Sequence, residues 1–249
     1  MKINVLLSPH NVDELYFSKK TTVVIDVLRA TTVIVTALGS GAREVIPVSS
    51  VDFAMKVSGN AFGGQTMLGG ERNTNKIEGF SLGNSPSEYK GETVVGKSII
   101  LYTTNGSKAI VKSKFSENLF ICSFPNLNAI AKHIAKLNSD TEILCAGSNG
   151  MFCIEDTVCA GRLINEISSI SEDVELTDAA KASVVLNNSF GDNIFEMLKN
   201  SEHGLKLINN GYEEDLNDCA ALSISETIPY YNSGVIKVYK EEDINSKPE

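Results

Sequence analysis

The sequence predicts an α/β protein with a mainly parallel sheet that helices cover on both faces, followed by a largely helical C-terminal part. In the first two thirds of the chain, short runs rich in β-branched residues alternate with helical patterns, which is typical of parallel strands joined by helices. Continuous apolar runs such as Val23-Val24-Ile25 fit strands buried on both faces. After Glu155 the patterns become largely helical.

Six runs in the first part of the chain are predicted to be strands. They cover residues 3–7, 22–27, 44–48, 98–102, 119–122 and 142–146. Helical patterns fill most of the gaps between them, at residues 31–38, 51–57, 107–112 and 127–137. Further helices are predicted at residues 156–168, 178–186, 192–200 and 213–223, and a last strand at residues 235–239 closes an edge of the sheet.

The least regular pattern lies between residues 59 and 96, where glycines and polar residues cluster. We expect a long ordered loop there, and such loops inside a compact domain are usually functional. Residues 1–240 are predicted to form a single α/β domain, which could divide into lobes of residues 1–150 and 151–240. Residues 241–249 form a charged tail that is expected to fray.

Composition excludes several classes of function. A net charge of −9 argues against a nucleic-acid surface, because phosphate backbones are bound by clustered Lys and Arg. The five cysteines include no C-x-x-C pair, so neither a disulfide framework nor a zinc site is indicated. No apolar run approaches the roughly 20 residues that span a bilayer, and the start of the chain lacks a signal-peptide pattern. We therefore expect a cytoplasmic protein without membrane contact.

The first candidate site follows the second predicted strand, at the C-terminal side where open α/β sheets bind ligands. Asp26 ends the buried run, and Arg29, Thr31 and Thr32 lead into a helix. A carboxylate there suits Mg²⁺, while Arg29 and the first amides of the helix suit phosphate or sulfonate oxygens. The structural alternative is that Asp26 pairs with Arg29 and that Thr31 caps the helix.

Two further candidate segments are rich in glycine, hydroxyls and amides. Glu71 and Arg72 follow paired glycines that would let the backbone approach a ligand, which makes Glu71 a second candidate metal ligand. The other segment, Thr103-Thr104-Asn105-Gly106-Ser107, lies between a strand and a helix and could surround an oxyanion, as could Asn84 and Ser85 in the stretch before it. Solvated turns and a helix N-cap are the structural alternatives.

Two acids, Glu155 and Asp156, open the helix that follows the last strand of the first part. Acids in a first turn stabilise the helix dipole in any case, but three carboxylates from distant segments could build one Mg²⁺ site. His203 could contact a phosphate or act as an acid, although a solvated loop histidine is the more ordinary interpretation. The chain has no G-x-S-x-G, Walker A or C-x₅-R sequence, so metal-assisted hydrolysis is favoured.

Four segments in order, VVIDVLRATT, LGGERNTNKIEGFSLGNSP, TTNGS and CAGSNGMFCIEDTVCAG, make the chain resemble the 2-phosphosulfolactate phosphatase family. A looser likeness continues around residues 201–204 and Ile228-Pro229. The resemblance implies a three-layer α/β/α sandwich with a mainly parallel or mixed sheet. It also implies Mg²⁺-dependent hydrolysis of 2-phospho-3-sulfolactate to 3-sulfolactate and phosphate, on a route to coenzyme M or sulfolactate.

The resemblance assigns roles to positions that match the family's motifs. Catalytic positions are Asp26, Arg29, Glu71 and Asp156, and the metal ligands would come from Asp26, Glu71, Glu155 and Asp156. Substrate contacts would come from Arg29, Thr31, Thr32, Arg72, Asn84, Ser85, Thr104, Asn105, Gly106 and, in the looser region, His203. The chain departs from the pattern at Ser81, where an acid is expected, and at Ser107, where Thr is more usual.

Several alternatives remain open from the sequence. Water could attack the phosphate, or Asp26 could be the nucleophile and form an aspartyl phosphate. The substrate could be another small phosphorylated organic acid, and one metal ion or two could be bound. The same loops could instead make a non-catalytic binder of small anions, while an isochorismatase-like hydrolase is disfavoured because Cys145 lies within a predicted strand. The sequence also allows a homo-oligomer.

Overall fold

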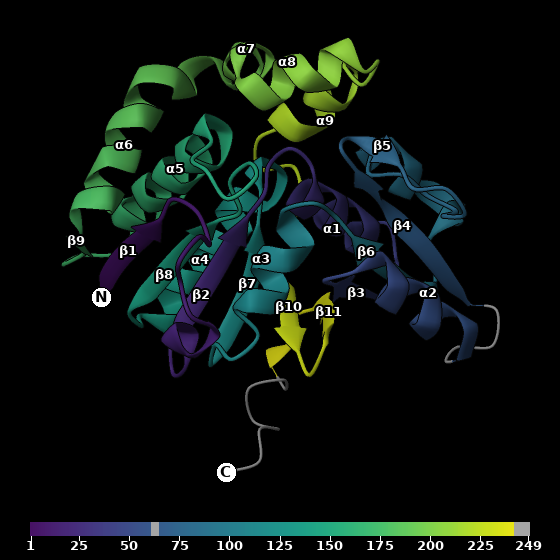
Figure 1. Ribbon diagram of the computed structural model, residues 1–249. Helices are drawn as coiled ribbons and strands as arrows, with labels where there is room; N and C mark the ends of the chain where they lie inside the picture. Colours follow the sequence, from purple (N-terminus) through teal and green to yellow (C-terminus); the bar gives the residue numbers. More distant parts are fainter. Residues whose placement is uncertain (61–64, 242–249) are drawn as a thin grey trace.

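The computed structural model describes residues 1–60 and 65–241, which form one mixed sheet with helices on both sides (Figure 1). The strands are β1 (Lys2–Leu6), β2 (Thr21–Ile25), β3 (Glu44–Val48), β4 (Thr66–Arg72), β5 (Asn75–Lys76), β6 (Ser98–Tyr102), β7 (Asn118–Cys122), β8 (Thr141–Cys145), β9 (Glu175–Leu176), β10 (Pro229–Asn232) and β11 (Val235–Val238). The helices are α1 (Ala30–Gly39), α2 (Val51–Asn60), α3 (Gly106–Lys112), α4 (Leu127–Leu137), α5 (Ile154–Ile170), α6 (Asp178–Phe190), α7 (Ile194–Asn200), α8 (Glu202–Asn209) and α9 (Asp215–Ala220).

The strand order is β5-β4-β6-β3-β11-β10-β7-β2-β8-β1-β9. It contains two parallel blocks, β4-β6-β3 and β7-β2-β8-β1. The antiparallel hairpin of β10 and β11 joins them through the pairs Tyr230 with Phe120 and Ile236 with Val45. In a flat sheet, these three antiparallel steps would put the carboxyl ends of the two blocks at opposite edges.

The twist of the sheet brings those ends together. Neighbouring strands rotate by roughly 20–25° on average, so the five steps from β2 to β6 accumulate roughly 100–125°. Figure 1 shows β2 and β4 both running towards the same end of the molecule. A Cβ built on Gly106, just after β6, would lie 2.5 Å from Oδ2 of Asp26, just after β2. The functional residues of both blocks therefore meet.

Helices cover both faces of this twisted sheet. On one face, α1 and α3 pack against residues of both blocks, such as Val24 and Ile99. On the other face, α4 and α5 pack against Phe120 and its neighbours, and α2 packs near Ile100. Successive residues of a strand point to opposite faces of the sheet, so the buried side chains divide into two layers, one on each face. The predicted three-layer α/β/α arrangement with a mixed, mostly parallel sheet is confirmed.

The C-terminal helices form a cap. Figure 1 shows α7, α8 and α9 lying above the carboxyl ends of the strands. No helix among residues 1–60 and 65–241 is both long enough and apolar enough to cross a membrane.

Some predicted elements are wrong. The expected loop from residue 59 to residue 96 contains β4 and β5, apart from residues 61–64, which lie outside the described residues. The glycines that suggested a loop are needed in the strand, because a Cβ on Gly70 would lie 1.8 Å from the carbonyl oxygen of Tyr102 in β6. The helix predicted at residues 213–223 covers only Asp215–Ala220, and neither α8 nor β10 was predicted. Most of the predicted tail, residues 242–249, also lies outside the described part.

Candidate active site

The turn after β2 holds Asp26 at the carboxyl end of the strand. Oδ1 of Asp26 accepts a hydrogen bond from the Ala30 amide at 3.1 Å. The Thr31 hydroxyl donates to the Asp26 carbonyl at 2.8 Å, and the Thr32 hydroxyl donates to the Val27 carbonyl at 2.9 Å. Both threonines are fully buried, so they hold the turn and do not reach a ligand.

The start of α5 brings two buried acids to the same place. Asp156 accepts from the Val27 amide at 2.9 Å through Oδ1 and from the Gly147 amide at 3.0 Å through Oδ2, which ties the turn after β2 to the loop after β8. Glu155 is only 2% exposed, and Nδ1 of His203 lies 3.7 Å from its Oε1. Glu155 therefore keeps oxygens that no backbone amide occupies among the residues described.

Glu71, at the end of β4, joins the other parallel block to this cluster. Its Oε1 accepts from the Thr104 amide and its Oε2 from the Thr74 amide, each at 2.7 Å. Both carboxylate oxygens are thus occupied by loop amides. Arg72, the next residue, is exposed on the opposite side of the strand and does not join the site.

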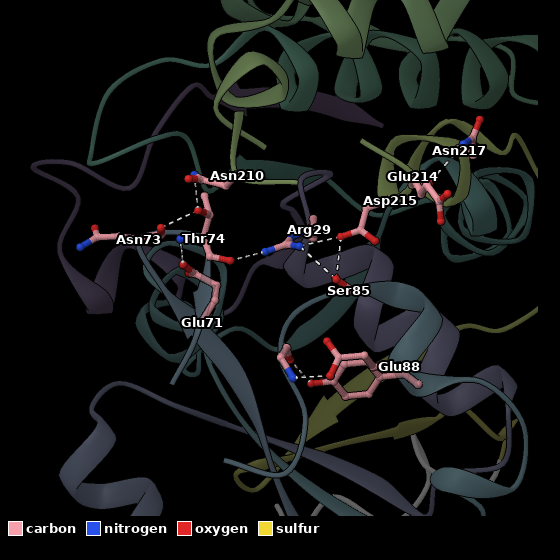
Figure 2. A network of polar contacts seen from close by, with 12 residues as sticks. Arg29, Glu71, Asn73, Thr74, Ser85, Glu88, Asn210, Glu214, Asp215 and Asn217 are labelled. Atoms are coloured by element: carbon pink, nitrogen blue, oxygen red, sulfur yellow. Dashed lines mark hydrogen bonds and ion pairs between the residues drawn. The ribbon is translucent and has the colours of Figure 1, made fainter. Parts of the chain in front are cut away.

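The Arg29 guanidinium lies in a buried polar network between the sheet and the cap (Figure 2). Nη1 donates to Oδ2 of Asp215 in α9 at 2.6 Å and to the Ser85 hydroxyl at 3.3 Å. Nη2 donates to the Thr74 carbonyl at 2.8 Å. The guanidinium also lies over the Tyr212 ring, with Cζ 4.5 Å from the ring centre. Arg29 therefore connects α9 to the turn that follows Glu71 and β4.

These elements enclose a small cavity under the cap. It is lined by Asp26, Leu28, Arg29, Glu71, Thr74, Asn84, Thr103, Asn105 and His203. Its volume of about 10 Å³ corresponds to room for about one water molecule. In the described part of the chain, Oδ1 of Asn84 and Oγ1 of Thr104 are buried without a hydrogen-bond partner. Unpaired buried polar atoms are costly, so a ligand that paired them would be stabilised here.

The electrostatics of the cluster favour a cation. Burial raises the pKa of Asp26 from 3.8 to about 6; His203 and the Ala30 amide oppose this rise, while Glu71 and Glu155 add to it. Burial, together with Asp26 and Glu155, also raises the pKa of Asp156 well above its ordinary value. A bound cation would relieve the repulsion among these carboxylates.

The residues present fit Mg²⁺ in donor type. Within the described residues, no three His, Cys, Asp or Glu side chains are arranged to hold a metal ion. Mg²⁺ usually keeps several waters and takes only one or two carboxylates together with substrate phosphate oxygens. Asp26 and Glu155 supply two such carboxylates, because each keeps an oxygen that no amide of residues 1–60 or 65–241 occupies. A magnesium site of this kind is compatible with the cluster.

The structure brings together most of the residues that the sequence singled out. Asp26, Arg29, Glu71, Asn84, Asn105 and His203 line one cavity, Glu155 and Asp156 adjoin Asp26, and Gly106 packs against it. Thr104 lies beside the cavity, and the Ser85 hydroxyl donates to Asp215. Thr31 and Thr32 instead donate to backbone carbonyls of the turn after β2. Arg72 is exposed away from the site. The interpretation of His203 as a solvated loop residue is wrong, since it lies in the first turn of α8 and faces Glu155.

Three residues of the site were missed by sequence reasoning: Thr74, Tyr212 and Asp215. Asp215 and Tyr212 lie about 185 positions from Arg29 in a helical region where acids and tyrosines are ordinary surface residues. Thr74 contributes a backbone carbonyl, which no side-chain pattern reveals. No sequence pattern around any of these three residues indicates a functional role.

Known proteins of similar sequence share one description. A family model described as 2-phosphosulpholactate phosphatase matches residues 6–234. Relatives named "Probable 2-phosphosulfolactate phosphatase" include that of Caldanaerobacter subterraneus subsp. tengcongensis, 39% identical over 93% of this chain and 96% of the relative. The relative from Clostridium beijerinckii is 37% identical over 95% of this chain and 99% of its own. The one from Clostridium acetobutylicum is 39% identical over 95% and 100%.

Proposed function

The chain belongs to the 2-phosphosulpholactate phosphatase family of phosphoric monoester hydrolases, and we propose that it hydrolyses 2-phospho-3-sulfolactate to 3-sulfolactate and phosphate with Mg²⁺ as cofactor. The observation that carries this proposal is one cavity lined by Asp26, Glu71, Arg29 and His203. Two more buried carboxylates, Glu155 and Asp156, lie close enough to Asp26 to interact with it electrostatically. Buried carboxylates repel an anionic ester, so a catalytic role for them with a phosphate requires a cation.

Asp26 and Glu155 are the residues that we propose to hold the metal ion. When bound, Mg²⁺ supplies charge neutralisation at the phosphoryl oxygens and activates or orients a water. Glu71 and Asp156 have both carboxylate oxygens bonded to loop amides, so we assign them the task of holding the loops and adding negative charge. This differs from the sequence prediction, in which the metal ligands came from Asp26, Glu71, Glu155 and Asp156.

The remaining residues provide contacts to the phosphate and a proton. The side chains of Asn84 and Asn105 line the cavity, where their amide groups can donate to phosphoryl oxygens, and Arg29 adds positive potential from one wall. In the reaction, water bonds to phosphorus while the bond from phosphorus to the C2 oxygen breaks, and that oxygen takes up a proton. One proton of the water stays on the phosphate, and the other replaces the proton given to the C2 oxygen. His203 is the proposed donor, since it lines the cavity and its Nδ1 lies 3.7 Å from Oε1 of Glu155.

Phosphate release from three esters tests the proposal. We expect strong activity on 2-phospho-3-sulfolactate with Mg²⁺, weaker activity on 2-phospholactate and phosphoglycolate, and none with EDTA. Activity on only the other esters would assign a different phosphorylated acid as substrate. Absence of turnover on all three, with tight metal-free anion binding, would contradict a phosphatase and favour a binder. Trapping of phosphate on Asp26 would contradict attack by water.

The cytosolic location, a homo-oligomeric state and a place on a route to coenzyme M or sulfolactate stay predictions from the sequence.

A further inference from the structure

A second, larger cleft lies beside the catalytic cavity. Its volume is about 410 Å³, and His10, Thr104, Asn105, Lys108, Lys112 and Asn149 are among the residues that line it. Asn105 lines both the cleft and the cavity. The Asn149 amide donates to Oδ1 of Asn105 at 3.1 Å, which fixes the loop after β8 against the wall that the two spaces share.

The charge of this cleft is opposite to that of the cavity. Its described lining contains two lysines and a histidine but no Asp or Glu, in a protein whose net charge is −9. Lys112 is fixed on the wall, where its Nζ donates to the Pro9 carbonyl at 2.7 Å. Lys108 is exposed, and its Nζ lies 5.9 Å from the centre of the Tyr102 ring. Among the described residues it forms no ion pair with a carboxylate. The cleft therefore offers an uncompensated cation next to a carboxylate-rich site.

We propose that this cleft binds the sulfonate group of the substrate and that Lys108 is a residue that determines specificity for it. The inference rests on the proposed function. The carboxylate of the substrate is bonded directly to the carbon that carries the phosphoester oxygen, whereas the sulfonate extends one carbon farther away. The longer arm is the one that can leave the small cavity and enter the neighbouring cleft.

The chemistry of the cleft suits this group. A sulfonate carries one negative charge over three oxygens, so it is best bound by a cation together with several N–H donors. Lys108 supplies the cation, and His10 and Asn149 lie on the same lining. Placing the sulfonate inside the cavity would instead bring it against Asp26 and Glu71. The charges of the two spaces therefore favour the sulfonate in the cleft and the phosphate in the cavity.

Substitution Lys108→Gln tests the inference through two esters that differ in the sulfonate. A hydrogen bond to a charged group contributes about 1.5–3 kcal/mol, so kcat/KM for 2-phospho-3-sulfolactate should fall by about 10–100-fold. For 2-phospholactate, which has no sulfonate, kcat/KM should change by less than about 2-fold, since the lost contact is absent. Lys132→Gln, which removes the same charge from the exposed side of α4, is the matched control and should leave both values unchanged.

Two outcomes would overturn the sulfonate subsite: an equal loss on both esters, or no loss on the sulfonated one. Calorimetric binding of 3-sulfolactate to the wild-type protein and to Lys108→Gln gives a readout that needs no turnover. If the wild-type protein hydrolyses neither ester but binds 3-sulfolactate at least about 10-fold more tightly than the variant, the phosphatase proposal fails and the subsite stands. Equal binding by both proteins contradicts the subsite.

Discussion

The carboxylate of Asp26 is buried among other carboxylates, and its pKa is raised as a result. Burial raises its pKa to about 6, mainly because the charged form loses its hydration. A carboxyl group with a raised folded-state pKa stabilises the fold fully below its unfolded pKa, and this contribution is lost as the pH rises through the folded pKa. Between about pH 4 and pH 6, the metal-free protein should therefore lose stability at this residue.

Asp26→Asn should stabilise the metal-free protein at pH 8. The amide keeps the acceptor for the Ala30 N–H without the buried charge, and a shift of about two pKa units corresponds to roughly 1–3 kcal/mol in the free energy of unfolding. Urea unfolding in EDTA at pH 8 and pH 4 measures the effect, which should mostly vanish at the lower pH. A variant less stable than the wild type at pH 8 would show that the Asp26 charge is compensated within the protein.

At the scale of elements, β4 shows how a functional strand can have the sequence of a loop. Gly70 has φ of +138°, and a Cβ at this position would meet the carbonyl oxygen of Tyr102. The glycine lets β4 pair with β6 so closely that Glu71 reaches the Thr104 amide. The irregular composition of this segment is thus a consequence of close packing.

Gly70→Ala should lower the free energy of unfolding by roughly 3 kcal/mol or more, because it combines backbone strain with a steric clash. Gly79→Ala is the matched control, since Gly79 also has positive φ (+81°) but no atom of the part of the chain that the structure describes lies within 4 Å of the added Cβ. The control should cost about 1–2 kcal/mol. Equal losses in chemical denaturation would mean that the close approach at Gly70 contributes nothing.

The sequence predicts the regular elements well and the cap poorly. Residues 44–48 and 98–102 were predicted as strands with the bounds of β3 and β6, because continuous β-branched runs mark buried parallel strands. Asp26 was singled out by its position after such a strand, whereas Glu71 was singled out by the paired glycines before it. His203 was misjudged, since a short helix that begins at Glu202 resembles a loop, and Asp215 acts only through a contact with Arg29 that the fold creates.

For the whole molecule, the curvature of the sheet and the cap together create the site. Curvature brings the ends of two parallel blocks to one place, and the cap closes over them through Arg29 and Asp215. The cavity beneath has room for about one water molecule, so binding of a phosphate ester requires the cap or its loops to shift. Arg29 and Asp215 form the main buried ion pair across this boundary in the described chain.

Asp215→Ala should destabilise the docked cap strongly. The Arg29 and Asp215 side chains are 2% and 7% exposed, and a buried guanidinium that loses its carboxylate costs about 3–5 kcal/mol. Asp218→Ala on the same helix removes only the exposed pair with Lys90 and should cost less than about 1 kcal/mol. Urea unfolding compares them, and a similar small loss in both variants would contradict the role of the pair as an anchor.

The most direct test of the central claim is the Mg²⁺ dependence of phosphate release from 2-phospho-3-sulfolactate in wild type, Glu155→Gln and Glu202→Gln. Glu202 is exposed near the start of α8, so its variant controls for charge. The wild type and Glu202→Gln should saturate at the same Mg²⁺ concentration, whereas Glu155→Gln should require at least about 10-fold more, since it loses one of two carboxylate ligands. Turnover that is unaffected by EDTA, or the same Mg²⁺ requirement in all three proteins, would contradict a magnesium ion held by Asp26 and Glu155.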